Sequence, residues 1–200
     1  MTSSSSPALG RGLDAMLIAY ALLDTHPASA ISEQFIRARA GWFTTATSRL
    51  EAKAVLTKVY GVAAASATQK LATLINGLVE VLPVDVKAAF DAMRLADTSG
   101  LDLSDAVLLS SALAQGATKL ATDDRRLAQA SRQAGLTVEN PVDGALRQQM
   151  AQWELVNLPA KGLPRILRQI YGWLSSTHPQ AASEFWSQTG GGSPGQLHHM

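Results

Sequence analysis

Hydrophobic residues follow two different spacings along residues 8–143. Short runs rich in β-branched and aromatic residues predict strands, whereas apolar residues at every third or fourth position predict helices. The predicted strands lie near residues 8–13, 42–48, 78–84, 117–122 and 136–141. Predicted helices begin at about residue 15 and then cover 27–41, 49–61, 64–78, 87–100, 103–116 and 124–135. Because long helical crossovers join parallel strands, this order predicts an α/β fold in which helices flank a parallel sheet of about five strands.

The strand signal ends at about Gly144. One helical stretch covers 145–158, and two more lie between 163 and 188, broken near His178 and Pro179. We therefore expect an α/β domain at 8–143, a helical extension at 144–188, and flexible termini at 1–7 and 189–200. About forty residues rarely form a stable core alone, so the extension is expected to pack on the domain or on a second copy in a homodimer.

Composition narrows the class of protein. The chain has 200 residues, of which 46% are hydrophobic and 16% charged, with a net charge of +1. This is enough apolar material for a core, and any polyanion must be bound by local patches. The absence of cysteine excludes disulfides and thiolate metal sites, and it fits a cytoplasmic protein. No signal peptide and no apolar run of membrane-span length is present, so no membrane partner is expected.

Acidic residues occur where predicted strands and helices meet, at Asp14, Glu51, Asp105 and Asp124. Each has a structural explanation. Asp14 and either Asp123 or Asp124 could cap the helices that follow them. Glu51 could close a capping box with Ser48. Asp102 could cap the next helix, with Asp105 as an acid in its first turn, where the helix dipole favours a carboxylate.

The joint arrangement favours a functional site. Ligands of open parallel sheets bind at the carboxyl ends of the strands, near the point where the strand order reverses, and these acids are predicted to gather there. Clustered carboxylates repel one another and need a cation when charged. Carboxylates without cysteine or histidine favour Mg²⁺ or Mn²⁺, which assist phosphodiester hydrolysis by activating water and neutralising charge.

The same residues carry a family resemblance. Residues 8–143 resemble a PIN-domain ribonuclease of the VapC-toxin type, with a PIN-like parallel sheet. The most specific stretch is LDLSDAVLLSSALAQGATKLATDDRRLAQASRQAGLTVENP, which combines L-x-x-D-A with T-x-D-R-x-L. The resemblance places Asp14, Glu51, Asp105 and Asp124 on the family's acidic positions and Thr122 on its usual hydroxyl. Asp123 is additional, and it either supports the site or caps a helix.

The resemblance implies a Mg²⁺- or Mn²⁺-dependent endoribonuclease. Asp14, Asp105 and Asp124 are then the metal ligands, and Glu51 completes the site or positions the attacking water. Basic residues near these acids either bind RNA phosphates or are ordinary solvated charges; they are Arg125, Arg126, Arg49 and Lys53. Two biological roles follow from the family: a toxin neutralised by an antitoxin protein, or a stand-alone RNA-processing nuclease.

The chain departs from the family after its first aspartate. The family usually has Thr or Ser there and then a polar residue such as Asn, whereas this chain has Ala15 and Met16. Polar neighbours orient carboxylate ligands, so their replacement weakens the expected metal site. The alternative prediction is therefore a catalytically degenerate PIN fold that acts as a protein- or RNA-binding module.

Overall fold

A parallel sheet forms the centre of the α/β part of the protein, in a computed structural model that describes residues 9–158 and 165–188. Its strands are β1 (Arg11–Leu13), β2 (Trp42–Thr45), β3 (Val79–Leu82), β4 (Lys119–Ala121) and β5 (Thr137–Glu139). The order is β3-β2-β1-β4-β5, and every pairing is parallel. This confirms the α/β fold with five strands. The termini expected at 1–7 and 189–200 lie outside the described residues.

Seven helices accompany these strands in the described α/β part, at or near the positions that the periodicity predicts. They are α1 (Ala15–Ala21), α2 (Ser29–Arg37), α3 (Ala46–Lys58), α4 (Ala64–Ile75), α5 (Val86–Ser99), α6 (Leu103–Ala114) and α7 (Arg125–Gln133). Four of them begin at a residue whose side chain accepts a backbone N–H of the first turn, namely Asp14, Thr45, Asp85 and Asp124. α5 ends at Gly100, whose φ of 68° is left-handed and suits glycine.

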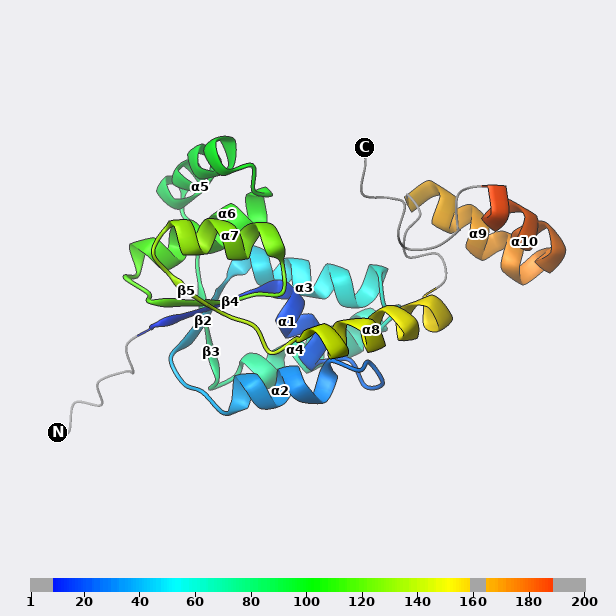
Figure 1. Cartoon of the computed structure of the whole chain (residues 1–200), viewed down its shortest axis with the longest axis horizontal. Helices are drawn as coiled ribbons and strands as arrows, with labels where there is room; N and C mark the ends of the chain where they lie inside the picture. The colour runs from blue at the N-terminus through cyan, green and yellow to red at the C-terminus, as the bar shows by residue number, and fades with distance from the viewer. Residues whose placement is uncertain (1–8, 159–164, 189–200) are drawn as a thin grey trace. The chain divides into compact units, whose positions relative to one another are not determined.

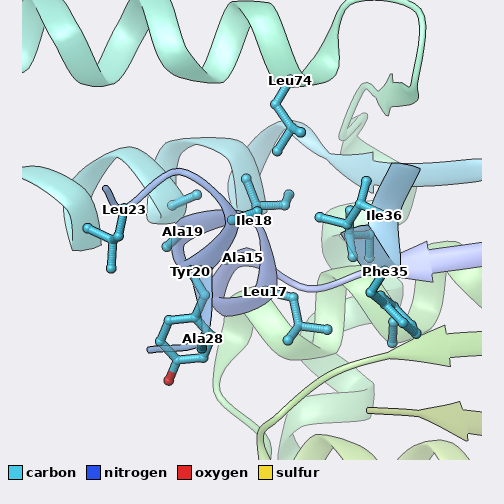
Figure 2. Packing of buried hydrophobic residues seen from close by; sticks show 14 of the residues in the cluster. Ala15, Leu17, Ile18, Ala19, Tyr20, Leu23, Ala28, Phe35, Ile36 and Leu74 are labelled. Carbon is cyan, nitrogen blue, oxygen red and sulfur yellow. The ribbon is translucent and has the colours of Figure 1, made fainter. Parts of the chain in front are cut away.

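Helices cover both faces of the sheet (Figure 1). On one face, α1 to α4 pack over Leu13, Trp42 and Val79. On the other, α5 to α7 pack over Phe43 and Leu120. Neighbouring residues of one strand, such as Trp42 and Phe43, thus enter different cores, as expected for a parallel sheet that is covered on both faces. Figure 2 shows α1 in the first of these cores, against side chains of α2 and α4.

The beginning of α3 differs from its prediction. β2 ends at Thr45, and α3 begins at Ala46, three residues before the predicted position. The Thr45 hydroxyl accepts the Ser48 N–H at 3.1 Å, so Thr45 is the cap and Ser48 is already inside the helix. The capping box of Ser48 with Glu51 is therefore wrong, and the Glu51 carboxylate is not used at the start of α3.

The chain divides into two compact units, Met1–Met150 and Ala151–Met200. Helix α8 (Gly144–Asn157) begins in the first unit, where Leu146 and Met150 are buried in the core beneath α1 to α4. The second unit contains α9 (Arg165–Thr177) and α10 (Pro179–Gln188), which contact each other through Tyr171 and Trp186, with ring centroids 5.4 Å apart. The helices predicted in the extension are therefore observed, with the break at Pro179.

Candidate active site

The strand order reverses at β1. Connections from β1 lead outward to β2 and β3 on one side, whereas β4 and β5 lie on the other side. Asp14 directly follows β1, and Thr122 directly follows the neighbouring β4. These residues therefore occupy the carboxyl ends of two adjacent strands, where open α/β sheets bind their ligands.

Asp14 is buried, with only 4% of the residue exposed, and hydrogen bonds of its side chain and backbone hold it in place. Its Oδ2 accepts the Thr122 hydroxyl at 2.7 Å, and its Oδ1 accepts the Met16 N–H at 3.4 Å. Its own N–H donates to the Ala121 carbonyl at 3.0 Å. Asp14 therefore caps α1 and is also one of the acids near the carboxyl ends of β1 and β4, which we call the acidic rim (Asp14, Glu51, Asp105 and Asp124). The capping explanation and the functional explanation are thus not exclusive.

Burial raises the pKa of Asp14 from 3.8 to about 6. The hydrogen bond from Thr122 lowers this pKa, and the charge of Glu51 raises it. Repulsion from Glu51 shows that α3 brings its carboxylate into the surroundings of Asp14. The Asp14 carboxyl is thus a group whose ionised form is costly as it stands.

Asp105 lies in the first turn of α6, and its pKa is affected by all the other acids of the rim. Burial raises its pKa from 3.8 to about 7, and further increases come from Asp14, Asp124, Glu51 and Asp102, in that order. The four acids predicted from the sequence therefore surround one region. Such mutual repulsion is typical of sites that bind a cation or exchange a proton.

Asp102 is a further acid of this rim that the sequence interpretation assigned to helix capping. It occupies the N-cap position of α6, but its side chain makes no capping hydrogen bond. The signal available in the sequence was the spacing of three residues between Asp102 and Asp105, which places both carboxylates on one side of the first turn.

Glu51, in the second turn of α3, accepts a hydrogen bond from the Ser104 hydroxyl of α6. Ser104 precedes Asp105, so one turn of α6 carries both an acid of the rim and a donor that holds another. The sequence interpretation missed Ser104, because no local pattern joins two residues that are 53 positions apart.

The two adjacent aspartates after β4 have separate roles. The Asp124 N–H donates to the Thr122 hydroxyl at 2.9 Å, and its Oδ1 accepts the Leu127 N–H at 2.8 Å, which caps α7. Asp123 instead accepts hydrogen bonds from Asn140 at 3.0 Å and from Arg147 at 2.6 Å. The structure thus brings Thr122 and Asp124 to the rim, whereas the Asp123 side chain is bound to Asn140 and to α8.

Basic side chains flank the rim without neutralising it. Arg125 and Arg126 are exposed at the start of α7, and Arg49 and Lys53 are partly exposed on α3 beside Glu51. Within residues 9–158, no ion pair joins any of these four side chains to an acid of the rim.

The donor set at the rim consists of oxygen atoms, which suits Mg²⁺ or Mn²⁺ chemically. In the part of the chain that the structure describes, no three acidic or histidine side chains are arranged so that they could hold a metal ion. Asp124 is exposed and Glu51 partly exposed, whereas Asp14 is buried.

Solved structures of other proteins share this fold, and two of them are VapC20 and PAE2754. VapC20 from Mycobacterium tuberculosis, described as a sarcin-ricin loop cleaving toxin, is 14% identical with a TM-score of 0.53, over 64% of this chain and 97% of that one. PAE2754 from Pyrobaculum aerophilum is 22% identical with a TM-score of 0.52, over 74% of this chain and 100% of that one. No curated protein matches the sequence.

None of the helices in the described ranges is long and apolar enough to cross a membrane. The family model of the PIN domain matches residues 13–133, which begin at the last residue of β1 and end with α7. This range contains Asp14, Glu51, Asp105 and Asp124, the four acids that surround the rim. With more than half of its length matched, the chain belongs to the PIN domain family.

Proposed function

We propose that the protein is a Mg²⁺- or Mn²⁺-dependent endoribonuclease whose active site is the acidic rim. Proteins with this domain are in general nucleases that depend on divalent metal ions. The observation that carries the proposal is the placement of Asp14 at the carboxyl end of β1, with Glu51, Asp105 and Asp124 near enough for their charges to act on one another; burial and this crowding raise the pKa of both Asp14 and Asp105. Both carboxyls are charged only at a cost that a bound cation would remove, and neither has a basic partner in residues 9–158.

In this proposal Asp14, Asp105 and Asp124 hold the metal, and Glu51 completes the site or orients the attacking water. A divalent cation supplies a bound water of lowered pKa and neutralises charge that develops at phosphorus. Thr122 donates its hydroxyl to Asp14 and so fixes the direction of that carboxylate. Ser104 does the same for Glu51. Arg125, Arg126, Arg49 and Lys53 would bind the RNA phosphates on both sides of the cleaved bond.

The test is cleavage of RNA by the full chain with Mg²⁺ or Mn²⁺ and with EDTA, for the wild type and for Asp105→Asn. We expect metal-dependent cleavage by the wild type and none by the variant. Cleavage in EDTA, or equal cleavage by both proteins, would contradict the proposal.

We also propose the toxin role, in which an antitoxin protein neutralises the nuclease. The support is the resemblance of the segment around Asp105 and Asp124 to VapC toxins. Induced expression of the wild type should stop growth of a bacterial host, whereas Asp14→Asn should not. Unimpaired growth together with RNA cleavage in vitro would favour the stand-alone processing nuclease.

A degenerate binding module is the second candidate, and two observations favour it. Ala15 and Met16 replace the polar residues usual after the first aspartate, and Ala15 is fully buried in the core. In addition, no three acids of the described residues are already arranged to hold a metal ion. RNA binding without Mn²⁺ binding and without cleavage, measured on the full chain, would select this candidate.

A further inference from the structure

Three consecutive residues after β4 connect three parts of the protein. Thr122 bonds to Asp14 through its hydroxyl, and its N–H donates to the Glu139 carbonyl at 3.1 Å. Asp124 faces the acidic rim and caps α7. Asp123, between them, is bound to Asn140 and Arg147. The position of two rim residues is therefore tied to whatever holds Asp123.

Arg147 of α8 is the main partner of Asp123. Its Nη2 donates to Asp123 Oδ1 at 2.6 Å, with side-chain exposures of 9% for Asp123 and 39% for Arg147. The same Oδ1 accepts the Asn140 side chain at 3.0 Å, and Asn140 in turn accepts the Val142 N–H at 2.8 Å. A charged hydrogen bond with a largely buried carboxylate is stronger and more directional than an exposed pair.

Helix α8 holds Arg147 firmly in place. Asp143 caps the helix by accepting the Leu146 N–H at 2.7 Å, and Leu146 and Met150 are buried in the core. Arg147 lies in the first turn, where the helix dipole disfavours a cation. The position is therefore not explained by the helix itself, whereas the contact with Asp123 explains it.

We propose that Arg147 is a positioning residue for the acidic rim, which acts through Asp123 to fix Thr122 and Asp124. The proposal rests on the metal-dependent activity proposed above. It assigns a role to a residue outside the range that the PIN family model matches, 13–133. The start of the helical extension would then be part of the working nuclease, because it orders the loop that carries a metal ligand and the hydroxyl that orients another.

The test compares Arg147→Met with two controls in the full chain. Arg132→Met removes the same charge at an exposed position of α7. Met150→Ala removes a buried contact of α8 but leaves Arg147 and Asp123 in place. One readout is amide hydrogen exchange of the 122–124 loop without metal. The other is Mn²⁺ affinity by calorimetry, well below the melting temperature of each variant.

We expect Arg147→Met to speed exchange in the 122–124 loop and to weaken Mn²⁺ binding roughly 10-fold or more, as loss of supporting contacts does in other metal sites. Asp123→Ala should give the same loss, and the double variant Asp123→Ala, Arg147→Met should lose no more than either alone. Arg147→Lys, which keeps a cationic donor, should restore part of the affinity. Met150→Ala should lower the melting temperature and leave Mn²⁺ affinity unchanged.

Equal Mn²⁺ affinity and equal loop exchange in wild type and Arg147→Met would overturn the proposal. So would a loss in Met150→Ala that matches the loss in Arg147→Met, because the docking of α8 rather than the ion pair would then be responsible. Failure of the proposed function has a different signature, since the wild type itself would then bind no Mn²⁺ and cleave no RNA.

Discussion

Carboxylates at the two ends of β1 have pKa values that are shifted in opposite directions. At its first residue, Arg11 donates to Glu139, and Lys119 and Arg39 approach the same carboxylate at 3.6 and 4.0 Å. Burial alone would raise the pKa of Glu139, but the hydrogen bond and charge of Arg11 outweigh it and the net pKa is lowered. After the last residue of β1, Asp14 lies among other acids and its pKa is raised.

The difference separates a carboxylate whose charge is compensated by neighbouring cations from carboxylates that lie among other acids. Glu139 has cations that stabilise its charge, so it needs nothing further. The charged neighbours of Asp14 and Asp105 are mainly other acids, which repel them. Asp14 and Asp124 also cap helices, but Asn would cap these helices equally well without the repulsion. A carboxylate cluster that the protein leaves without a cation is the better indicator of a bound ligand.

The largest effect is expected from Asp14→Asn. The amide oxygen can still cap α1 by accepting the Met16 N–H, and the NH2 group then faces the Thr122 hydroxyl as a donor, but the negative charge of the proposed metal ligand is lost. Loss of several kcal/mol of electrostatic stabilisation corresponds to a fall in the rate of metal-dependent RNA cleavage of roughly 100-fold or more. The free energy of unfolding at neutral pH should stay equal or rise, as measured by urea denaturation.

Asp85→Asn is the matched control for this variant. Asp85 caps α5 through the Ala88 N–H at 2.7 Å, and it is exposed. Cleavage should therefore be unchanged. A markedly lower melting temperature for Asp14→Asn with normal cleavage would show that Asp14 serves only as a cap.

The second effect is a pH dependence of stability without metal. The pKa of Asp14 is about 6 in the folded protein and 3.8 in the reference state, so the folded state binds more protons between these values. The free energy of unfolding should therefore fall as pH rises through this window, by about 3 kcal/mol from Asp14. Asp105, with a pKa of about 7, extends the fall to neutral pH.

Denaturation in EDTA from pH 5 to 8, for the wild type and Asp14→Asn, measures this dependence. The slope should be smaller in the variant, and Mn²⁺ should stabilise the wild type most at the upper end. A wild-type protein whose stability rises over this range would contradict the raised pKa values. Glu139 has the opposite sign, because its lowered pKa adds stability above pH 4.5 that is lost at lower pH.

The third effect is a loss of stability in Glu139→Gln without loss of activity. Three cations would lose their shared carboxylate, and hydrogen bonds to charged groups typically contribute about 1.5–3 kcal/mol each. Because these side chains are partly exposed, we expect a decrease of about 1–2 kcal/mol in the free energy of unfolding. Equal RNA cleavage by wild type and variant would confirm that this end of β1 is structural.

Glu33→Gln is the matched control for Glu139→Gln. Glu33 pairs with Arg37 at 2.8 Å on the surface of α2, with side-chain exposures of 43% and 52%. An exposed pair of this kind contributes about 0.3–0.5 kcal/mol, so the control should change stability much less. An equal decrease in the free energy of unfolding for both variants would mean that Glu139, although it lies among three cations, contributes no more to stability than an exposed ion pair.

The smallest effect is expected from Arg125→Ala with Arg126→Ala. Two phosphate contacts to single-stranded RNA would be lost, so affinity should fall a few-fold and the slope of log affinity against log salt should decrease by about 0.7 for each contact. Fluorescence anisotropy at several salt concentrations measures both quantities. Arg132→Ala, at the other end of α7, should change neither, and an unchanged slope in the double variant would make Arg125 and Arg126 ordinary surface charges.

Sequence patterns predicted the sheet and the helices between its strands, because these depend on local periodicity, and this element order indicated which acids gather at one edge of the sheet. The beginning of α3 was less determined. Hydroxyl residues occupy four of the five positions from Thr44 to Ser48, and each of them can act as a cap. Packing of β2 against its neighbours selects Thr45, and this choice leaves Glu51 free for the rim.

Contacts between distant residues lay beyond the sequence interpretation. Ser104 meets Glu51 across 53 positions, and Arg147 meets Asp123 across 24. The second contact decides between two adjacent aspartates that are equivalent by pattern: Asp123 turns to α8, and Asp124 remains to cap α7. A single sequence contains no signal for such pairings, because they depend on how helices pack on the sheet.

The central position of β1 in the sheet restricts the movement of the Asp14 backbone. β1 is bonded to strands on both sides, and the Asp14 N–H continues the pairing with β4 through Ala121. The backbone of Asp14 is therefore held by the hydrogen bonds of the sheet itself, whereas the carboxylates of Glu51 and Asp124 are held by hydrogen bonds from the Ser104 hydroxyl and the Leu127 N–H. In the proposed nuclease, Asp14 would therefore be the fixed point of the metal site, and adjustment to the ion would come from exchange of the side-chain hydrogen bonds of Glu51 and Asp124.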